Sequence, residues 1–201
     1  MAIRLSSAII CSYMAKNREL VIAVHGGAGF KKAKKGQLDC IEEVIRTGIS
    51  ILRDGGSGLD AVEKMIILME DSGLFNAGSG SHLQMDGAAR MDASIMEGKD
   101  LMAGAVASVS GIANPIACAR LIMDKSLHIM LAGEGARRFG AHYNLRELRS
   151  IDKEGLKAVK RSLDLGGDQA RLYKSVYGCE TVGAVAIDLE GLENVSIGIG
   201  T

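Results

Sequence analysis

The apolar residues of this chain switch repeatedly between the spacing of a strand and the spacing of a helix. The run LVIAVHGG (20–27) is short, β-rich and closed by glycines, so we predict a strand that leads into a tight loop. Apolar side chains at helical spacing over 37–53, and again over 58–73, predict two amphipathic helices. Two further strands, 90–98 and 101–111, are expected on either side of the hairpin-type turn EGKD.

The second half of the chain continues this mixture. Pro115 favours a helix over 115–126, because proline is well tolerated in the first helical turn. The run LHIMLAG (127–133) predicts a short strand, with a helix in EGARRFGAHY after it. Residues 144–178 are charge-rich and carry few apolar residues suited to a core, so we interpret them as a mobile linker. Two strands around a turn are expected within 181–200, and the mixture of elements predicts a layered α/β fold.

Composition narrows the classes of protein. With 201 residues, 47% of them hydrophobic, and a single proline, the chain is long enough for one well-packed domain. The 24 basic and 24 acidic residues balance, so neither a nucleic acid nor a membrane surface is expected as a partner. The four cysteines and four histidines are scattered, which favours reduced thiols in a cytoplasmic protein and disfavours a zinc site. Residues 1–19 hold an apolar run too short to span a membrane, and we interpret them as an N-terminal extension without function.

The stretch YGCETVGAVAID (177–188) suggests a chemistry. A polar segment runs directly into a strand of small residues that begins with Thr181. A threonine hydroxyl needs an adjacent base, and an N-terminal threonine supplies one in its own α-amino group, whose ordinary pKa is about 7.7–8.0. Inside an intact chain that nitrogen is an amide, so the chain would have to be cut just before Thr181. From these residues alone, a structural threonine in a buried strand is the commoner alternative.

Other residues that suggest chemistry have plain alternatives as well. Asn76 lies in the glycine-rich loop GLFNAGSGS (73–81), where an asparagine often serves only to adopt a left-handed turn. His25 precedes two glycines and could equally be a satisfied core histidine. Asp92 in MDASIM is expected to be structural. The GSGS sequence lacks the spacing and the lysine of a phosphate-binding loop, so nucleotide binding is not expected.

Seven motifs in register resemble the plant-type asparaginase and isoaspartyl peptidase family, whose members are N-terminal nucleophile hydrolases. The resemblance covers residues 20–201. It implies an αββα sandwich, incomplete in this chain. Residues 20–180 would be the α-subunit portion, with a polar linker over about 144–180, and residues 181–201 would begin the β-subunit. The motifs are VIAVHGGAG, LFNAGSGS, MDASIMEG, AGAVASV, NPIACARLIM, GEGARRF and TVGAVAID.

The resemblance also implies roles for individual residues. The chain would cleave itself between Glu180 and Thr181, close to the loop His25-Gly26-Gly27. Thr181 would be the nucleophile, Thr201 the second threonine that orients it, and Asn76 a hydrogen-bond donor to the reacting group. No cofactor is required. A structural sodium ion would be bound by backbone carbonyl groups of Met69, Glu70, Ser72, Phe75, Ala77 and Ser79.

The implied reaction is hydrolysis of the side-chain amide of L-asparagine and of β-aspartyl (isoaspartyl) dipeptides, with glycosylated asparagine as an alternative substrate. Relatives form a homo-oligomer of αβ units. Family members continue past the point that matches Thr201, and that later part carries an Arg and an Asp that hold the substrate, together with a Thr-Gly pair that forms the oxyanion hole. A catalytically inactive truncated fragment or scaffold without a substrate pocket is therefore the alternative.

Overall fold

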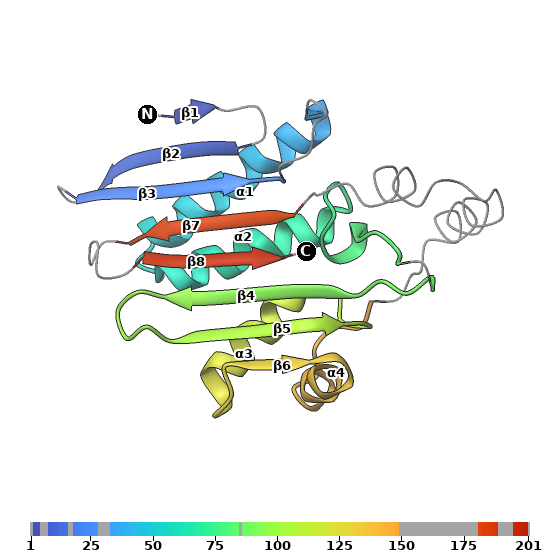
Figure 1. Cartoon of the computed structure of the whole chain (residues 1–201). Helices are drawn as coiled ribbons and strands as arrows, with labels where there is room; N and C mark the ends of the chain where they lie inside the picture. The colour runs from blue at the N-terminus through green and yellow to red at the C-terminus, as the bar shows by residue number, and fades with distance from the viewer. Residues whose placement is uncertain are drawn as a thin grey trace.

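The computed structural model describes residues 2–4, 8–15, 18–27, 33–84, 86–148, 181–188 and 195–200, which form one mixed sheet with helices packed on it. The strands follow one another in the order β1-β2-β3-β7-β8-β4-β5-β6 (Figure 1). Neighbouring strands are antiparallel except for β5 and β6, which are parallel. The strands are β1 (Ala2–Arg4), β2 (Ala8–Ala15), β3 (Arg18–His25), β4 (Met91–Glu97), β5 (Ala103–Val109), β6 (Met130–Ala132), β7 (Val182–Ile187) and β8 (Val195–Gly200).

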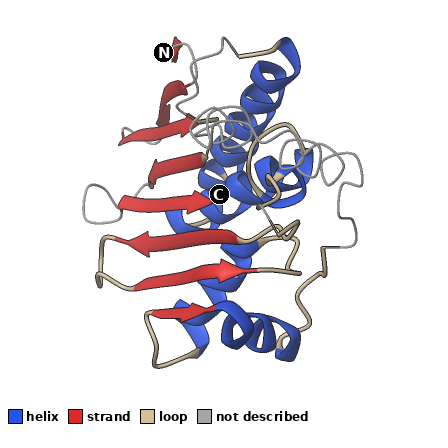
Figure 2. Ribbon diagram, turned by 45° about the vertical axis from the view of Figure 1, so that its right-hand side comes forward, coloured by secondary structure: helices blue, strands red, loops and turns tan. Residues whose placement is uncertain are grey.

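The helices lie over one face of this sheet (Figure 2). They are α1 (Lys35–Arg53), α2 (Gly58–Ser72), α3 (Pro115–Lys125) and α4 (Gly133–His142), with a 3-10 turn, η1 (Gly78–Gly80), after α2. Alternate strand residues are buried under the helices, including Ile22 in β3, Ile95 in β4 and Ala184 in β7. Residues of the other set are more open on the opposite face of the sheet, where Met96 and Ile197 keep 39% and 41% of their surface.

This arrangement confirms a mixed α/β fold. The described residues comprise one sheet and one helical layer, so the four-layer αββα sandwich stays a prediction. None of the helices in the described part of the chain combines the length and the apolar character that crossing a membrane requires.

Local residues mark the ends of α2 and α3. Ser57 and Asp60 form a capping box at the start of α2, and Gly73 ends that helix in the left-handed region with φ 67°. Pro115 occupies the first turn of α3. Two features differ from the predictions: the strand expected over 127–133 is only three residues long, and β1 and β2 lie within the segment interpreted as an extension. Whether that segment has a function stays open to test, although β2 pairs along the whole of β3.

Close packing explains how a core with few aromatic residues is filled. Gly104 in β5 lies against the backbone carbonyl of Ala119, so α3 sits directly on the strand. Gly198 in β8 lies against the Val62 side chain in the same way. A β-carbon at either glycine would collide with the helix above it. These glycines therefore let the helices approach the sheet more closely than side chains would allow.

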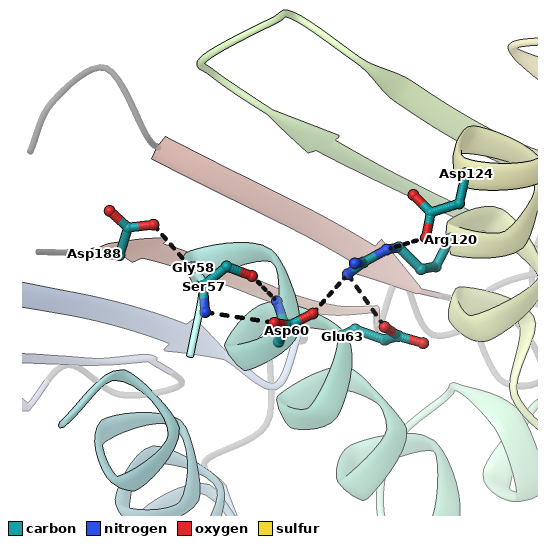
Figure 3. A network of polar contacts seen from close by, with 7 residues as sticks. All are labelled: Ser57, Gly58, Asp60, Glu63, Arg120, Asp124 and Asp188. Carbon is teal, nitrogen blue, oxygen red and sulfur yellow. Dashed lines mark hydrogen bonds and ion pairs between the residues drawn. The ribbon is translucent and has the colours of Figure 1, made fainter. Parts of the chain in front are cut away.

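Polar contacts hold α2 in place between its neighbours (Figure 3). Arg120 on α3 contacts three carboxylates: those of Asp60 at 3.2 Å and Glu63 at 3.4 Å on α2, and that of Asp124 on its own helix at 2.8 Å. At the other end of this group, the carboxylate of Asp188, just past β7, accepts a hydrogen bond of 3.1 Å from the backbone N–H of Gly58. These contacts join the start of α2 to both α3 and the sheet.

Candidate active site

The residues expected to act chemically gather at one end of the sheet (Figure 1). Strand β3 ends there at His25, β7 begins there, and β8 ends there at Gly200, because neighbouring strands in this part of the sheet are antiparallel. Helix α2 also ends on this side, so the glycine-rich loop that follows it lies at the end of the sheet where β7 begins (Figure 1). Segments far apart in the sequence therefore meet at a single edge.

Thr181 immediately precedes β7 and is half-buried. The side chains of Val182 and Ala184 are buried under the helices, so the alternation of the strand turns Thr181 and Gly183 toward the opposite face. On the neighbouring strand, Gly200 pairs with Val182. Glu180 and Thr201 lie outside the described residues.

His25 lies across the strand pair from Gly183, two residues from Thr181. The imidazole packs so closely on Gly183 that its Nε2 atom occupies the space of a β-carbon there. The Nδ1 atom accepts a hydrogen bond of 3.2 Å from the backbone N–H of Gly27, and burial lowers the pKa of His25. Burial thus favours the neutral ring, which is satisfied locally, as a structural histidine would be, and lies next to β7.

The loop that carries Asn76 is pressed against the His25-Gly26-Gly27 turn. A β-carbon on Gly26 would come within 2.5 Å of the Phe75 ring, so this contact requires glycine. The Oδ1 atom of Asn76 accepts a hydrogen bond of 2.8 Å from the backbone N–H of His82. This bond orients the Asn76 amide. The Nδ2 group at the other side of the amide is a hydrogen-bond donor.

The carbonyl groups expected to bind sodium surround the end of α2. Within this group, the Met69 carbonyl accepts a hydrogen bond from the Ser72 hydroxyl, and the Glu70 carbonyl accepts one from Ser79, both at 2.8 Å. The donor set is made of neutral oxygens at the negative end of a helix dipole, which is the chemistry that a hard cation prefers. No group of three histidine, cysteine, aspartate or glutamate side chains suited to a metal occurs among the residues that the structure describes.

The side chain of Glu70 has a role that its sequence position did not indicate. It is fully buried, and its carboxylate accepts hydrogen bonds from the backbone N–H of Ile116 at 3.2 Å and from the Asn114 amide at 3.1 Å. It therefore caps the start of α3 from a different helix. Burial is the main cause that raises the pKa of Glu70 to about 8. Asn114 also donates to Asp71 at 2.9 Å, which is in turn paired with Arg146.

The structure thus brings together Thr181, the His25-Gly26-Gly27 turn and the loop of Asn76, which no local pattern in the sequence could place side by side. It also assigns contacts to Glu70 and Asp92 that sequence reasoning missed. Glu70 was named only for its carbonyl, and Asp92 accepts a hydrogen bond of 2.6 Å from the backbone N–H of Ser108. The only sequence signal for the Glu70 contact was an acidic residue on the apolar face of a helix.

Comparison with known proteins identifies the family of this chain. A sequence model of the family described as "Asparaginase" matches residues 18–201. The isoaspartyl peptidase/L-asparaginase of Homo sapiens is 40% identical over 177 residues, which are 85% of this chain and 57% of that protein. That of Rattus norvegicus is 42% identical over 180 residues, which are 86% of this chain and 53% of the relative.

A relative from an archaeon is equally similar. The plant-type L-asparaginase of Pyrococcus horikoshii is 42% identical over 185 residues, which are 85% of this chain and 60% of that protein. The chain therefore belongs to the asparaginase family. It spans little more than half the length of the curated relatives it matches.

Proposed function

We propose that this chain carries the nucleophile of an N-terminal threonine hydrolase, which acts on the side-chain amide of L-asparagine and on β-aspartyl dipeptides. The observation that carries the proposal is the meeting of Thr181, the His25-Gly26-Gly27 turn and the Asn76 loop at one end of the sheet. The names of the relatives, isoaspartyl peptidase/L-asparaginase, support the same substrates.

The first step of the proposed mechanism is self-cleavage. The Thr181 hydroxyl attacks the carbonyl carbon of Glu180, the peptide C–N bond breaks, and the acyl group moves from nitrogen to oxygen. Water then hydrolyses this ester, which leaves a carboxylate on Glu180 and a free α-amino group and hydroxyl on Thr181. The glycines of the His25 turn carry no side chain and would allow this bond to approach the turn closely.

Hydrolysis of substrate follows with the new α-amino group as base. It takes the proton of the Thr181 hydroxyl while the oxygen attacks the side-chain amide carbon of the substrate. The Nδ2 group of Asn76 donates a hydrogen bond to the reacting group. The amine or ammonia leaves with a proton, and water releases the β-aspartyl group from Thr181. We assign Thr201 to orienting the nucleophile, because its neighbour Gly200 pairs with Val182, the neighbour of Thr181.

Three further assignments belong to this proposal. A sodium ion that supports the loop of Asn76 without taking part in the reaction would be held by the backbone carbonyl groups of Met69, Glu70, Ser72, Phe75, Ala77 and Ser79. The active form would be a homo-oligomer of αβ units. Its location would be cytoplasmic, in line with the scattered cysteines, of which Cys40 and Cys118 are free thiols.

The intact mass of the purified protein, followed over time, tests the proposal. We expect a fragment that begins at Thr181 to appear in the wild type and to be absent in Thr181→Ala. Thr181→Ser keeps a hydroxyl and is the matched control, which should still cleave at a measurable rate. Cleaved protein should then release aspartate from a β-aspartyl dipeptide and ammonia from asparagine. Cleavage at the same rate in Thr181→Ala would disprove the role of this residue.

A further inference from the structure

Asn114 lies just before α3, at the position where an asparagine side chain usually caps a helix. Within the described part of the chain, its side chain makes no such hydrogen bond. The backbone N–H of Ile116 is capped instead by the carboxylate of Glu70, which lies 3.2 Å away on α2. Because the Asn114 amide does not cap its own helix, it is available for contacts with other parts of the fold.

The Asn114 amide joins three side chains. Its Nδ2 atom donates to the carboxylates of two consecutive residues at the end of α2, Glu70 at 3.1 Å and Asp71 at 2.9 Å. Its Oδ1 atom accepts a hydrogen bond of 3.0 Å from Arg146, which is also paired with Asp71. One amide therefore links the end of α2 to the start of α3 and to the chain after α4, and both of its polar atoms are engaged.

The same two acidic residues hold the glycine-rich loop after α2 through their backbone. The Ser79 hydroxyl donates to the carbonyl oxygens of Glu70 at 2.8 Å and Asp71 at 3.3 Å. Gly78 has φ 54° and lies so close to Glu70 that a β-carbon there would come within 2.5 Å of the Glu70 side chain. The loop therefore packs on a pair of residues whose side chains are fixed by Asn114.

We propose that Asn114 is a positioning residue for Asn76, which lies within this loop. Asn114 holds the side chains of Glu70 and Asp71, and the loop that rests on these two residues presents the Asn76 amide at the end of the sheet where β7 begins. This inference rests on the proposed function, in which Asn76 donates a hydrogen bond to the reacting group. It adds a residue that acts on Asn76 from the start of α3.

Three substitutions test this role. Asn114→Ser keeps a residue that is well suited to a helix start, but its single, shorter hydroxyl cannot donate to both carboxylates. Arg146→Gln is a milder second variant, because the Arg146 side chain is 61% exposed and its replacement should leave the chain folded. Ser126→Ala is the matched control, since it removes a hydroxyl that donates to the Ile122 carbonyl at 2.8 Å, at the other end of α3.

Hydrogen exchange of the His82 backbone N–H measures the effect without depending on activity. This N–H donates to the Oδ1 atom of Asn76 at 2.8 Å and belongs to an exposed residue, so its exchange rate follows the formation of that bond. At constant sodium concentration, exchange should be about tenfold faster or more in Asn114→Ser, faster also in Arg146→Gln, and unchanged in Ser126→Ala. Wild-type exchange in a folded Asn114→Ser or in Arg146→Gln, or an equal acceleration in Ser126→Ala, would overturn the inference.

Hydrolysis of a β-aspartyl dipeptide by the cleaved protein provides the second readout. A misplaced donor acts mainly on the transition state, so Asn114→Ser should lower kcat about tenfold or more with little change in KM, while Ser126→Ala keeps both constants. A wild-type kcat in Asn114→Ser would also overturn the inference. If the wild type hydrolyses no dipeptide, the proposed function fails, whereas exchange of the His82 N–H still decides whether Asn114 holds Asn76 in position.

Discussion

The buried carboxyl of Glu70 should make the stability of the fold depend strongly on pH. The pKa of Glu70 is raised to about 8 from an ordinary value of 4.5, chiefly by burial. The folded state therefore binds this proton more tightly than the unfolded chain does. Its contribution to stability is complete below pH 4.5, declines as the pH rises toward 8, and changes little above that.

The size of this effect follows from the shift. Each pKa unit corresponds to 1.36 kcal/mol. At pH 7 the Glu70 carboxyl is ionised in the unfolded chain but mostly protonated in the folded one, so the free energy of unfolding is about 3 kcal/mol lower than at pH 4.5. Glu70→Gln does not titrate, so it should remove the pH dependence of stability that Glu70 causes. The glutamine keeps an oxygen for the Ile116 N–H but loses the hydrogen bond from Asn114, which should lower the free energy of unfolding by about 1 kcal/mol. The variant should be the more stable protein near pH 8 and the less stable one near pH 5.

Urea unfolding followed by circular dichroism at pH 5 and pH 8, with sodium held constant, measures both effects. Glu43→Gln, which removes an exposed carboxylate from α1, controls for the change in net charge and should leave the pH dependence unchanged. If the wild type and Glu70→Gln lose the same free energy of unfolding between these pH values, burial of Glu70 does not control the dependence.

Two other substitutions test the packing of the site and of the helices. Gly183→Ala places a β-carbon where the His25 ring lies, so it should displace the ring. Self-cleavage, measured by intact mass, should then be at least tenfold slower. Unchanged cleavage would show that the position of His25 is unimportant. Arg120→Met leaves three carboxylates without their shared cation and should lower the free energy of unfolding by about 1–2 kcal/mol at pH 7. The loss should shrink at low pH, because burial raises the pKa of Glu63 and its protonation removes one of the negative charges. An equal loss at pH 7 and pH 4 would contradict an electrostatic cause.

Much of the secondary structure could be predicted because its signals are local. The periodicity of α1 and α2, the capping residue Ser57 and the proline at the start of α3 each act within one or two turns of chain. Their helices were therefore predicted to within two residues. Strands β1 and β2 were missed because no local turn signal or regular alternation marks them, and their existence depends on pairing with β3.

The candidate site was only partly predictable for the same reason. Thr181, Asn76 and the His25 turn carry recognisable residue types in recognisable motifs. Glu70 looks like an ordinary helical glutamate until α3 is packed against it. Such contacts join residues 44 or more positions apart in the chain, as in the Glu70–Asn114 pair, which no local pattern encodes.

The amino-acid sequence by itself determined the mixture of helices and strands and the helix boundaries, since each of these depends on the conformational preferences of a few neighbouring residues. The tertiary structure alone decided the strand order β3-β7-β8-β4, and with it which side chains share a face and a row. That order results from burying all the apolar stripes together against the helices, which is a property of the whole chain. The placement of β7, which follows Thr181, beside the strand that ends at His25 is a consequence of that global packing.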